Sequence, residues 1–133
     1  MRSDNVEKIP KAIGPYSAFR REGPLLLTSG QLPINPVTSQ IDSENIKAQV
    51  KQALENLKAI IHLNGGSLEN LLKVTVLLVD LNDFNAVNQV FEEFFSIPYP
   101  ARTAYEVSKL PMGAKVEIEG IVYLDEEIRL SAN

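Results

Sequence analysis

The sequence predicts an α+β domain in which two long helices cover one face of a mixed β-sheet. Two stretches repeat apolar residues at three- and four-residue steps, which is the spacing of an amphipathic helix. Five shorter stretches have the apolar content of strands, and the elements follow the order ββαβαββ. The 133 residues contain no internal repeat, low-complexity tract or linker, so residues 1–133 are expected to form one domain.

The sheet is expected to begin with a hairpin. The irregular residues 1–15 lead into two short strands over 16–21 and 25–31, and the Glu-Gly-Pro sequence at 22–24 joins them as a turn. The two prolines within residues 33–36 cannot continue a central strand, because they lack a backbone donor. A surface loop is therefore expected after the second strand.

The first helix is expected over residues 43–63. Its apolar side chains recur every three or four residues, with lysine, glutamine, glutamate and asparagine between them. Asp42 or Ser43 is expected to cap its first turn, and Gly65 and Gly66 are expected to end it.

The second helix is expected to follow a cap at Asn82 or Asp83 and to end before Pro98 and Pro100. Its length and spacing again predict one apolar face. That face carries Phe84, Val87, Phe91, Phe94 and Phe95.

Three more strands are expected over residues 71–79, 102–107 and 115–124. In the first of them the even positions are all apolar and are expected to face the helices; they are Leu72, Val74, Val76 and Leu78. The odd positions are polar at one end and apolar at the other. Because two helices can cover only one face, we expect a homo-oligomer that buries the second face, which carries Leu77, Val79 and Ile121.

Composition excludes several classes of protein. The absence of cysteine excludes disulfides, thiolate metal sites and a cysteine nucleophile, and the single histidine, His62, excludes a histidine cluster. The net charge of −4 and the scattered lysine and arginine residues disfavour a nucleic-acid partner. No apolar run is long enough to span a membrane, so a cytoplasmic protein is expected. No phosphate-binding loop, nucleophile elbow or dinucleotide fingerprint is present.

Arg102 is the first candidate for chemistry. It opens a strand, and the alternation of Thr103, Tyr105 and Val107 predicts that Arg102 points to the second, mixed face of the sheet. A guanidinium at the rim of a groove between subunits can bind a carboxylate with two hydrogen bonds. The alternative is a structural ion pair, for example with Glu106.

Polar residues elsewhere are candidates for the same site. Glu117 and Glu119 lie two apart on a strand and share one face, so each raises the pKa of the other and one can transfer protons near neutrality; the alternative is a solvated strand face. Asn88 falls on or beside the apolar stripe of its helix, where it either holds a backbone loop or faces a ligand. Gly30 ends a strand and allows close approach of a ligand, or it forms a turn.

Several segments together resemble one known family. They are residues 12–17 (AIGPYS), 28–31 (TSGQ), 74–88 (VTVLLVDLNDFNAVN), 100–102 (PAR) and 115–119 (KVEIE). In order and spacing, over nearly the whole chain, the sequence is similar to the RidA (YjgF) family of reactive-intermediate deaminases.

The resemblance implies a chorismate-mutase-like fold and a homotrimer whose sheets form a central barrel, with sites in the clefts between subunits. The implied reaction is hydrolysis of small 2-imino acids, the enamine and imine products of threonine and serine dehydratases, to 2-oxo acids and ammonia. No metal or organic cofactor is implied.

The resemblance also implies a role for each candidate residue. Arg102 matches the arginine that binds the substrate carboxylate, and Glu117 matches the acid that positions or activates water. The positions that match the pocket lining are Tyr16, Ser29, Gly30, Asn88 and Ala104.

This chain departs from the family pattern in three places. Many members carry cysteine at the position of Ala104, where the implied contact is through the backbone, so activity is expected to survive. Tyr105 replaces a smaller aliphatic residue, and residues 96–99 form a shorter segment than in some members. These changes leave the substrate range open.

Two other functions compete with this one. The first is a non-catalytic ligand-binding trimer that keeps Arg102 as a carboxylate receptor; the presence of Glu117 favours the enzyme. The second is an RNA-directed translation inhibitor or ribonuclease. The acidic charge, the absence of tryptophan and the lack of a basic-aromatic patch argue against it.

Overall fold

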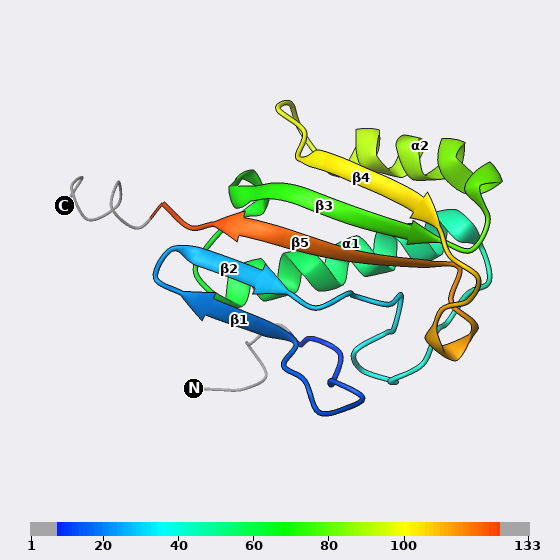
Figure 1. The fold of residues 1–133 in the computed structure, drawn as a ribbon, viewed down its shortest axis with the longest axis horizontal. Helices are drawn as coiled ribbons and strands as arrows, with labels where there is room; N and C mark the ends of the chain where they lie inside the picture. Colours follow the sequence, from blue (N-terminus) through cyan, green and yellow to red (C-terminus); the bar gives the residue numbers. More distant parts are fainter. Residues whose placement is uncertain (1–7, 126–133) are drawn as a thin grey trace.

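The computed structural model describes residues 8–125 and contains one five-stranded sheet covered on one face by two helices (Figure 1). The strand order is β1-β2-β5-β3-β4, and β3 and β4 form the parallel pair of this otherwise antiparallel sheet. The strands are β1 (Phe19–Glu22), β2 (Leu25–Thr28), β3 (Leu71–Leu78), β4 (Ala101–Glu106) and β5 (Val116–Tyr123). The helices are α1 (Ile46–Leu63) and α2 (Phe84–Phe94). The predicted fold class is confirmed.

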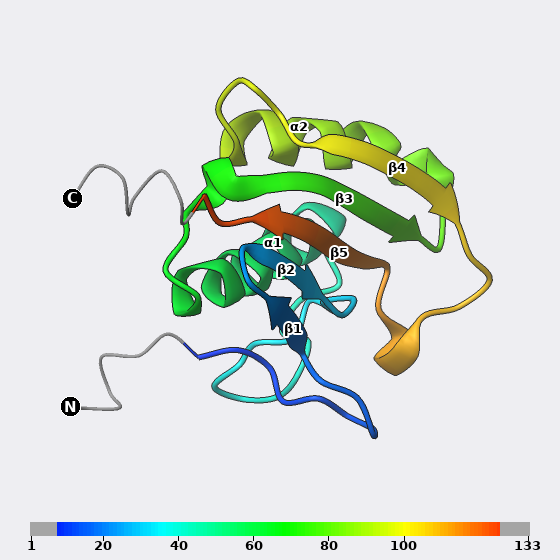
Figure 2. The same cartoon turned by 60° about the vertical axis from the view of Figure 1, so that its left-hand side comes forward.

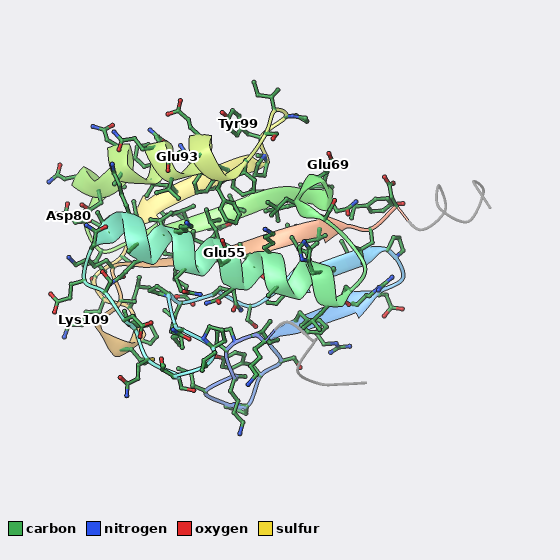
Figure 3. All side chains as sticks on the ribbon, turned by 180° about the vertical axis from the view of Figure 1, so that it is seen from behind. Glu55, Glu69, Asp80, Glu93, Tyr99 and Lys109 are labelled. Carbon is green, nitrogen blue, oxygen red and sulfur yellow. The ribbon has the colours of Figure 1, made fainter. Side chains whose placement is uncertain are left out.

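Both helices lie on the same side of the sheet, as the view from behind shows (Figure 3). Their apolar stripes pack on the inward side chains of β3 and β5, among them Val74, Val76, Val116 and Ile118, which are fully buried. No helix of the described residues combines the length and apolar composition that a membrane span requires.

The hairpin forms where the sequence predicts it, with Gly23 at a positive φ of 58° in the turn. Both of its strands are shorter than predicted, because the chain leaves the regular ladder after Thr28. Gln31 then returns to the sheet as an isolated bridge to Ile118 of β5. This bridge holds residues 29–31 beside the start of β5.

The predicted N-cap of the first helix is wrong. Asn45, and neither Asp42 nor Ser43, caps α1 by accepting a hydrogen bond from the backbone N–H of Ala48. Ser43 instead accepts from the backbone N–H of Asn45, so the cap is set by the turn before it.

A short 3₁₀ turn, Leu81–Asp83, precedes α2, and Asp83, one of the two predicted residues, is its N-cap. The side chain of Asp80 accepts from the N–H of Asn82, and Asp83 makes no capping hydrogen bond. The helix ends at Phe94, several residues before the first proline. The predicted apolar face is confirmed in part, because Val87, Phe91 and Phe95 are buried, whereas the Phe84 side chain is 36% exposed.

One inward position of β3 was predicted wrongly. The register between β3 and β5 shifts between Leu71 and Lys73, which turns Leu72 out to solvent, 56% exposed, and buries Leu71 in its place. Simple alternation cannot reveal such a bulge, because both side chains are leucine.

The second face of the sheet has no covering helix among the described residues, as predicted (Figure 2). Its large side chains are between 41% and 50% exposed, and they are Leu25, Leu27, Tyr105, Ile121 and Tyr123. We call these five residues the open-face cluster. An apolar surface of this size is typical of a protein interface.

Candidate functional site

A cavity of about 580 Å³ lies between α2 and the segment that leads into β4. Its volume is in the range of ligand pockets, about 300–1,000 Å³. Both polar and apolar side chains line it, namely Asn88, Phe91, Glu92, Tyr99, Pro100 and Arg102. Because β4 is an edge strand of the sheet, this cavity lies at the edge of the protomer.

Arg102 is held in this cavity by aromatic rings. The Cζ atom of its guanidinium lies 4.9 Å from the centre of the Phe84 ring and 5.1 Å from that of Phe91. These distances are typical of cation–π contacts, which orient the planar group without satisfying its donors. Within residues 8–125, Arg102 has no acidic partner.

The alternative of a structural ion pair with Glu106 is therefore wrong for the described residues. The carboxylate of Glu106 accepts a hydrogen bond of 3.0 Å from the backbone N–H of Leu81, at the other end of β4. The Arg102 donors stay available to an anion in the cavity.

Asn88 faces the same cavity. Of its two predicted roles, the one in which its amide holds a backbone loop is wrong, because the side chain makes no hydrogen bond within the described part of the chain. Asn88 lies on α2 between the two rings that contact Arg102, four residues after Phe84 and three before Phe91. An amide and a guanidinium thus present unused donors to one space.

The prediction that Arg102 points to the second, mixed face of the sheet is wrong. In the parallel register of β3 and β4, Arg102 pairs with the buried Val74, so its side chain leaves the sheet on the helix side. Glu117 pairs with Leu77, and Leu77 also pairs with Tyr105 of the open-face cluster. The two charged groups therefore lie on opposite faces of the sheet within one protomer.

Glu117 belongs to a second group of residues, on the open face. A Cβ atom built on Gly30 would lie 2.7 Å from Cδ and 2.9 Å from Cγ of Glu117, so the glutamate side chain lies directly on the glycine. Two backbone hydrogen bonds between Gln31 and Ile118, of 2.8 and 3.1 Å, hold the two segments together. The absence of a side chain at Gly30 is what makes room for the carboxyl.

The carboxyl of Glu117 is suited to proton transfer. Burial, and secondarily the negative charge of Glu119, raise its pKa above the ordinary value of 4.5. It accepts no hydrogen bond from the described residues, so its oxygens can meet a water molecule or a ligand. The predicted effect of Glu119 on the pKa of Glu117 is confirmed in direction, although burial is the larger cause.

The other predicted pocket residues divide between the two groups. Ser29 lies beside Gly30 and donates a 2.6 Å hydrogen bond to the carbonyl of Ser17. Tyr16, half exposed, and Gly30 both line a cavity of about 20 Å³. Ala104 lies on β4, on the same side as Arg102, and its methyl group packs against the core, which leaves its backbone for contacts at the sheet edge.

The start of β5 is fixed by a buried amide. The Gln49 side chain accepts a 2.8 Å hydrogen bond from the N–H of Lys115 and donates one of the same length to the carbonyl of Ser43. Asn56, also buried, donates to the carbonyls of Leu32 and Ile34. These contacts set the position of the loop that follows Gly30 and of the strand that carries Glu117.

Two features of the site were not predicted from the sequence. The ring contacts of Arg102 come from Phe84 and Phe91, which the helical spacing assigned to the core. The second feature is Glu92, which lines the Arg102 cavity. Its position four residues after Asn88 places the two side chains on the same face of one helix, and this spacing could have predicted it. Within residues 8–125, no three histidine, cysteine, aspartate or glutamate side chains gather as metal ligands would.

Gly30→Ala is expected to displace the Glu117 side chain and to lower any activity that depends on it at least about tenfold. The backbone of Gly30 is outside the left-handed region, so alanine adds no backbone strain there and the fold should persist. Circular dichroism and steady-state kinetics measure the two effects. In a Glu117→Gln background, the added Gly30→Ala substitution should lower the activity little further. If the double variant instead shows the full additional loss of about tenfold in activity, this interpretation is contradicted.

Comparison with known proteins agrees with this architecture. The family model described as Endoribonuclease L-PSP matches residues 6–124. A RutC family protein of Sinorhizobium fredii is 52% identical over 86% of this chain and 91% of its own length. The human 2-iminobutanoate/2-iminopropanoate deaminase is 41% identical over 88% of this chain and 85% of its own length.

The solved structures include a relative of the same shape. The crystal structure of RidA from an Antarctic Psychrobacter matches with a TM-score of 0.85 and 46% identity, over 88% of this chain and 94% of that one. Fold, sequence and the order of the signature segments thus agree over nearly the full length. The chain belongs to the Endoribonuclease L-PSP family, which is the RidA (YjgF) family.

Proposed function

We propose that this protein hydrolyses small 2-imino acids to 2-oxo acids and ammonia. The observation that supports this most is the guanidinium of Arg102, which lines a ligand-sized cavity beside Asn88 without an acidic partner in the described residues. The name of the human relative, 2-iminobutanoate/2-iminopropanoate deaminase, supplies the substrate class.

The chemistry needs few groups. Arg102 binds the substrate carboxylate through two charge-assisted hydrogen bonds and fixes the position of C2. Water attacks C2 of the protonated imine as Glu117 accepts its proton, so a C–O bond forms and the π electrons of C=N move to nitrogen. Glu117 then returns that proton to nitrogen. The C–N bond breaks as the hydroxyl oxygen forms the C=O bond and gives up its proton, which ammonia takes up, so that a 2-oxo acid and ammonium leave. One water is consumed, and no redox change occurs.

The proposed site requires a second copy of the chain. Arg102 and Glu117 lie on opposite faces of one protomer, so a single protomer cannot bring both to one substrate. A homotrimer whose open faces form a central barrel would bury the open-face cluster. In that assembly, the edge of one protomer that carries the Arg102 cavity lies against the Gly30 and Glu117 segment of the next.

The assembly gives an expected mass. Light scattering at micromolar concentration should report three copies of the 14.7 kDa chain. Ile121→Asp, which puts a charge into the open-face cluster, should yield monomers, because an unpaired charge at a buried interface costs several kcal/mol. Ala48→Asp, the same change of charge at an exposed position of α1, is the control and should stay trimeric. A monomeric wild type would refute the assembly.

The activity is tested with an imine made in situ. A threonine dehydratase releases 2-iminobutanoate, and this protein should accelerate its conversion to 2-oxobutanoate and ammonia well above the spontaneous rate. Binding of 2-oxobutanoate without acceleration would instead indicate the non-catalytic receptor. Salt-dependent RNA binding or cleavage, with no effect on the imine, would favour the activity that the family description names.

A further inference from the structure

The Arg102 cavity contains a second charge that the proposed reaction does not use. Glu92 lines it together with Arg102, yet the two side chains form no ion pair. Within residues 8–125, the carboxylate of Glu92 has neither a hydrogen bond nor a cationic partner. It is exposed and belongs to the cavity lining, so it contributes a carboxylate to that space.

The two charges occupy different parts of the cavity. The Arg102 guanidinium lies between the Phe84 and Phe91 rings, next to Asn88. Glu92 follows Asn88 by four residues, one helical turn or about 6 Å further along α2. There it shares the cavity lining with Tyr99 and Pro100. The cavity lining thus holds a cation and an anion that form no ion pair, together with apolar side chains.

These charged and apolar side chains would fix the orientation of a 2-imino acid bound in the cavity. Its carboxylate pairs with Arg102, and C2 must stay open to water from the Glu117 side. The side chain of the substrate is left with the remaining space, where Phe91, Tyr99 and Pro100 offer apolar contact and Glu92 offers a negative charge. A second carboxylate on the substrate would meet that charge, whereas an aliphatic or a cationic side chain would not be repelled.

We propose that Glu92 is a specificity-determining residue that excludes dicarboxylic 2-imino acids and admits those with neutral or basic side chains. This inference rests on the proposed function, because it takes Arg102 as the receptor for the first carboxylate. It assigns Glu92 no part in the chemical step. Repulsion between two like charges in a partly solvated cavity corresponds to about a fivefold loss of affinity or more at low ionic strength.

The stable products provide the test. Calorimetry on the whole protein at low ionic strength measures the dissociation constants of 2-oxopentanoate and 2-oxoglutarate, which share a five-carbon chain and differ by one carboxylate. The variants are Glu92→Gln and, as a matched control, Glu93→Gln, since Glu93 is an adjacent exposed glutamate that does not line the cavity. Figure 3 shows Glu93 on α2. The rate of 2-iminobutanoate hydrolysis is measured alongside.

We expect the wild type to bind 2-oxopentanoate at least about fivefold more tightly than 2-oxoglutarate, and this preference to shrink as salt is added. Glu92→Gln should remove most of the preference, and Glu93→Gln should leave it as it is. An unchanged preference in Glu92→Gln, or an equal change in Glu93→Gln, overturns the inference even where 2-iminobutanoate is hydrolysed. If the wild type neither accelerates that hydrolysis nor binds 2-oxopentanoate, the proposed function fails and the inference fails with it.

Discussion

Arg102→Ala should lower kcat/KM for 2-iminobutanoate at least about a hundredfold. A hydrogen bond to a charged group contributes about 1.5–3 kcal/mol, and more is lost when the removal leaves an anion unpaired. The loss should appear in steady-state kinetics and also as lost binding of 2-oxobutanoate in calorimetry. Stability should change little, because the guanidinium contacts two rings and no acid in the described residues, and exposed cation–π contacts are worth about 0.5–1 kcal/mol.

Two further variants separate binding from structure. Arg102→Lys should recover only part of the loss, because an ammonium cannot form the paired hydrogen bonds of a guanidinium. Lys47→Ala, at an exposed lysine of α1, is the control for loss of charge and should leave kcat/KM within about twofold. Equal binding of 2-oxobutanoate to wild type and Arg102→Ala would show that the arginine is not the carboxylate receptor.

Glu117→Gln should keep the fold and the affinity for 2-oxobutanoate while kcat falls at least about a hundredfold, since an amide cannot accept the proton of water. Stopped-assay kinetics and calorimetry measure the two quantities on the same preparation. A near-normal kcat would move the proton acceptor to Glu119 or remove side chains from the step altogether.

The pH dependence provides a second readout of Glu117. Burial and Glu119 raise the pKa of its carboxyl, and the ionised form is the one that accepts the proton, so kcat should fall as the pH drops through that raised pKa. Glu119→Gln removes the secondary cause and should shift the acid limb of the profile to lower pH. A profile that stays in place in Glu119→Gln would contradict the coupling between the two glutamates.

The helices and the sheet were predictable because their signals are redundant. The apolar stripe of α1 repeats over 18 residues, so the loss of any single cue would not change the prediction. The caps were not predictable in the same way, because Asp42, Ser43 and Asn45 are all good capping residues and the turn before the helix decides between them. Similarly, two adjacent leucines at 71 and 72 give no signal for a bulge.

The structure brings two of the predicted residues, Asn88 and Arg102, to one cavity, but the sequence did not predict the layout of the candidate site. Arg102 lies on an edge strand with apolar residues on both faces, so alternation with Tyr105 does not say which face meets the helices. The pairing with Val74 settles this, and a pairing register is a property of two strands that one strand cannot reveal. Glu92 was missed because a glutamate on a helix is usually a solvated residue, and only the cavity distinguishes it from Glu93.

The separation of Arg102 and Glu117 on opposite faces has a genetic consequence if neighbouring copies complete each proposed site. A chain that lacks the arginine still carries an intact glutamate surface, and a chain that lacks the glutamate still carries an intact arginine cavity. Co-assembly of two such inactive chains would rebuild a wild-type site wherever the intact glutamate surface of one chain meets the intact arginine cavity of the other. Two null alleles of the gene could then complement each other in one cell, which a site contained within a single protomer would never allow.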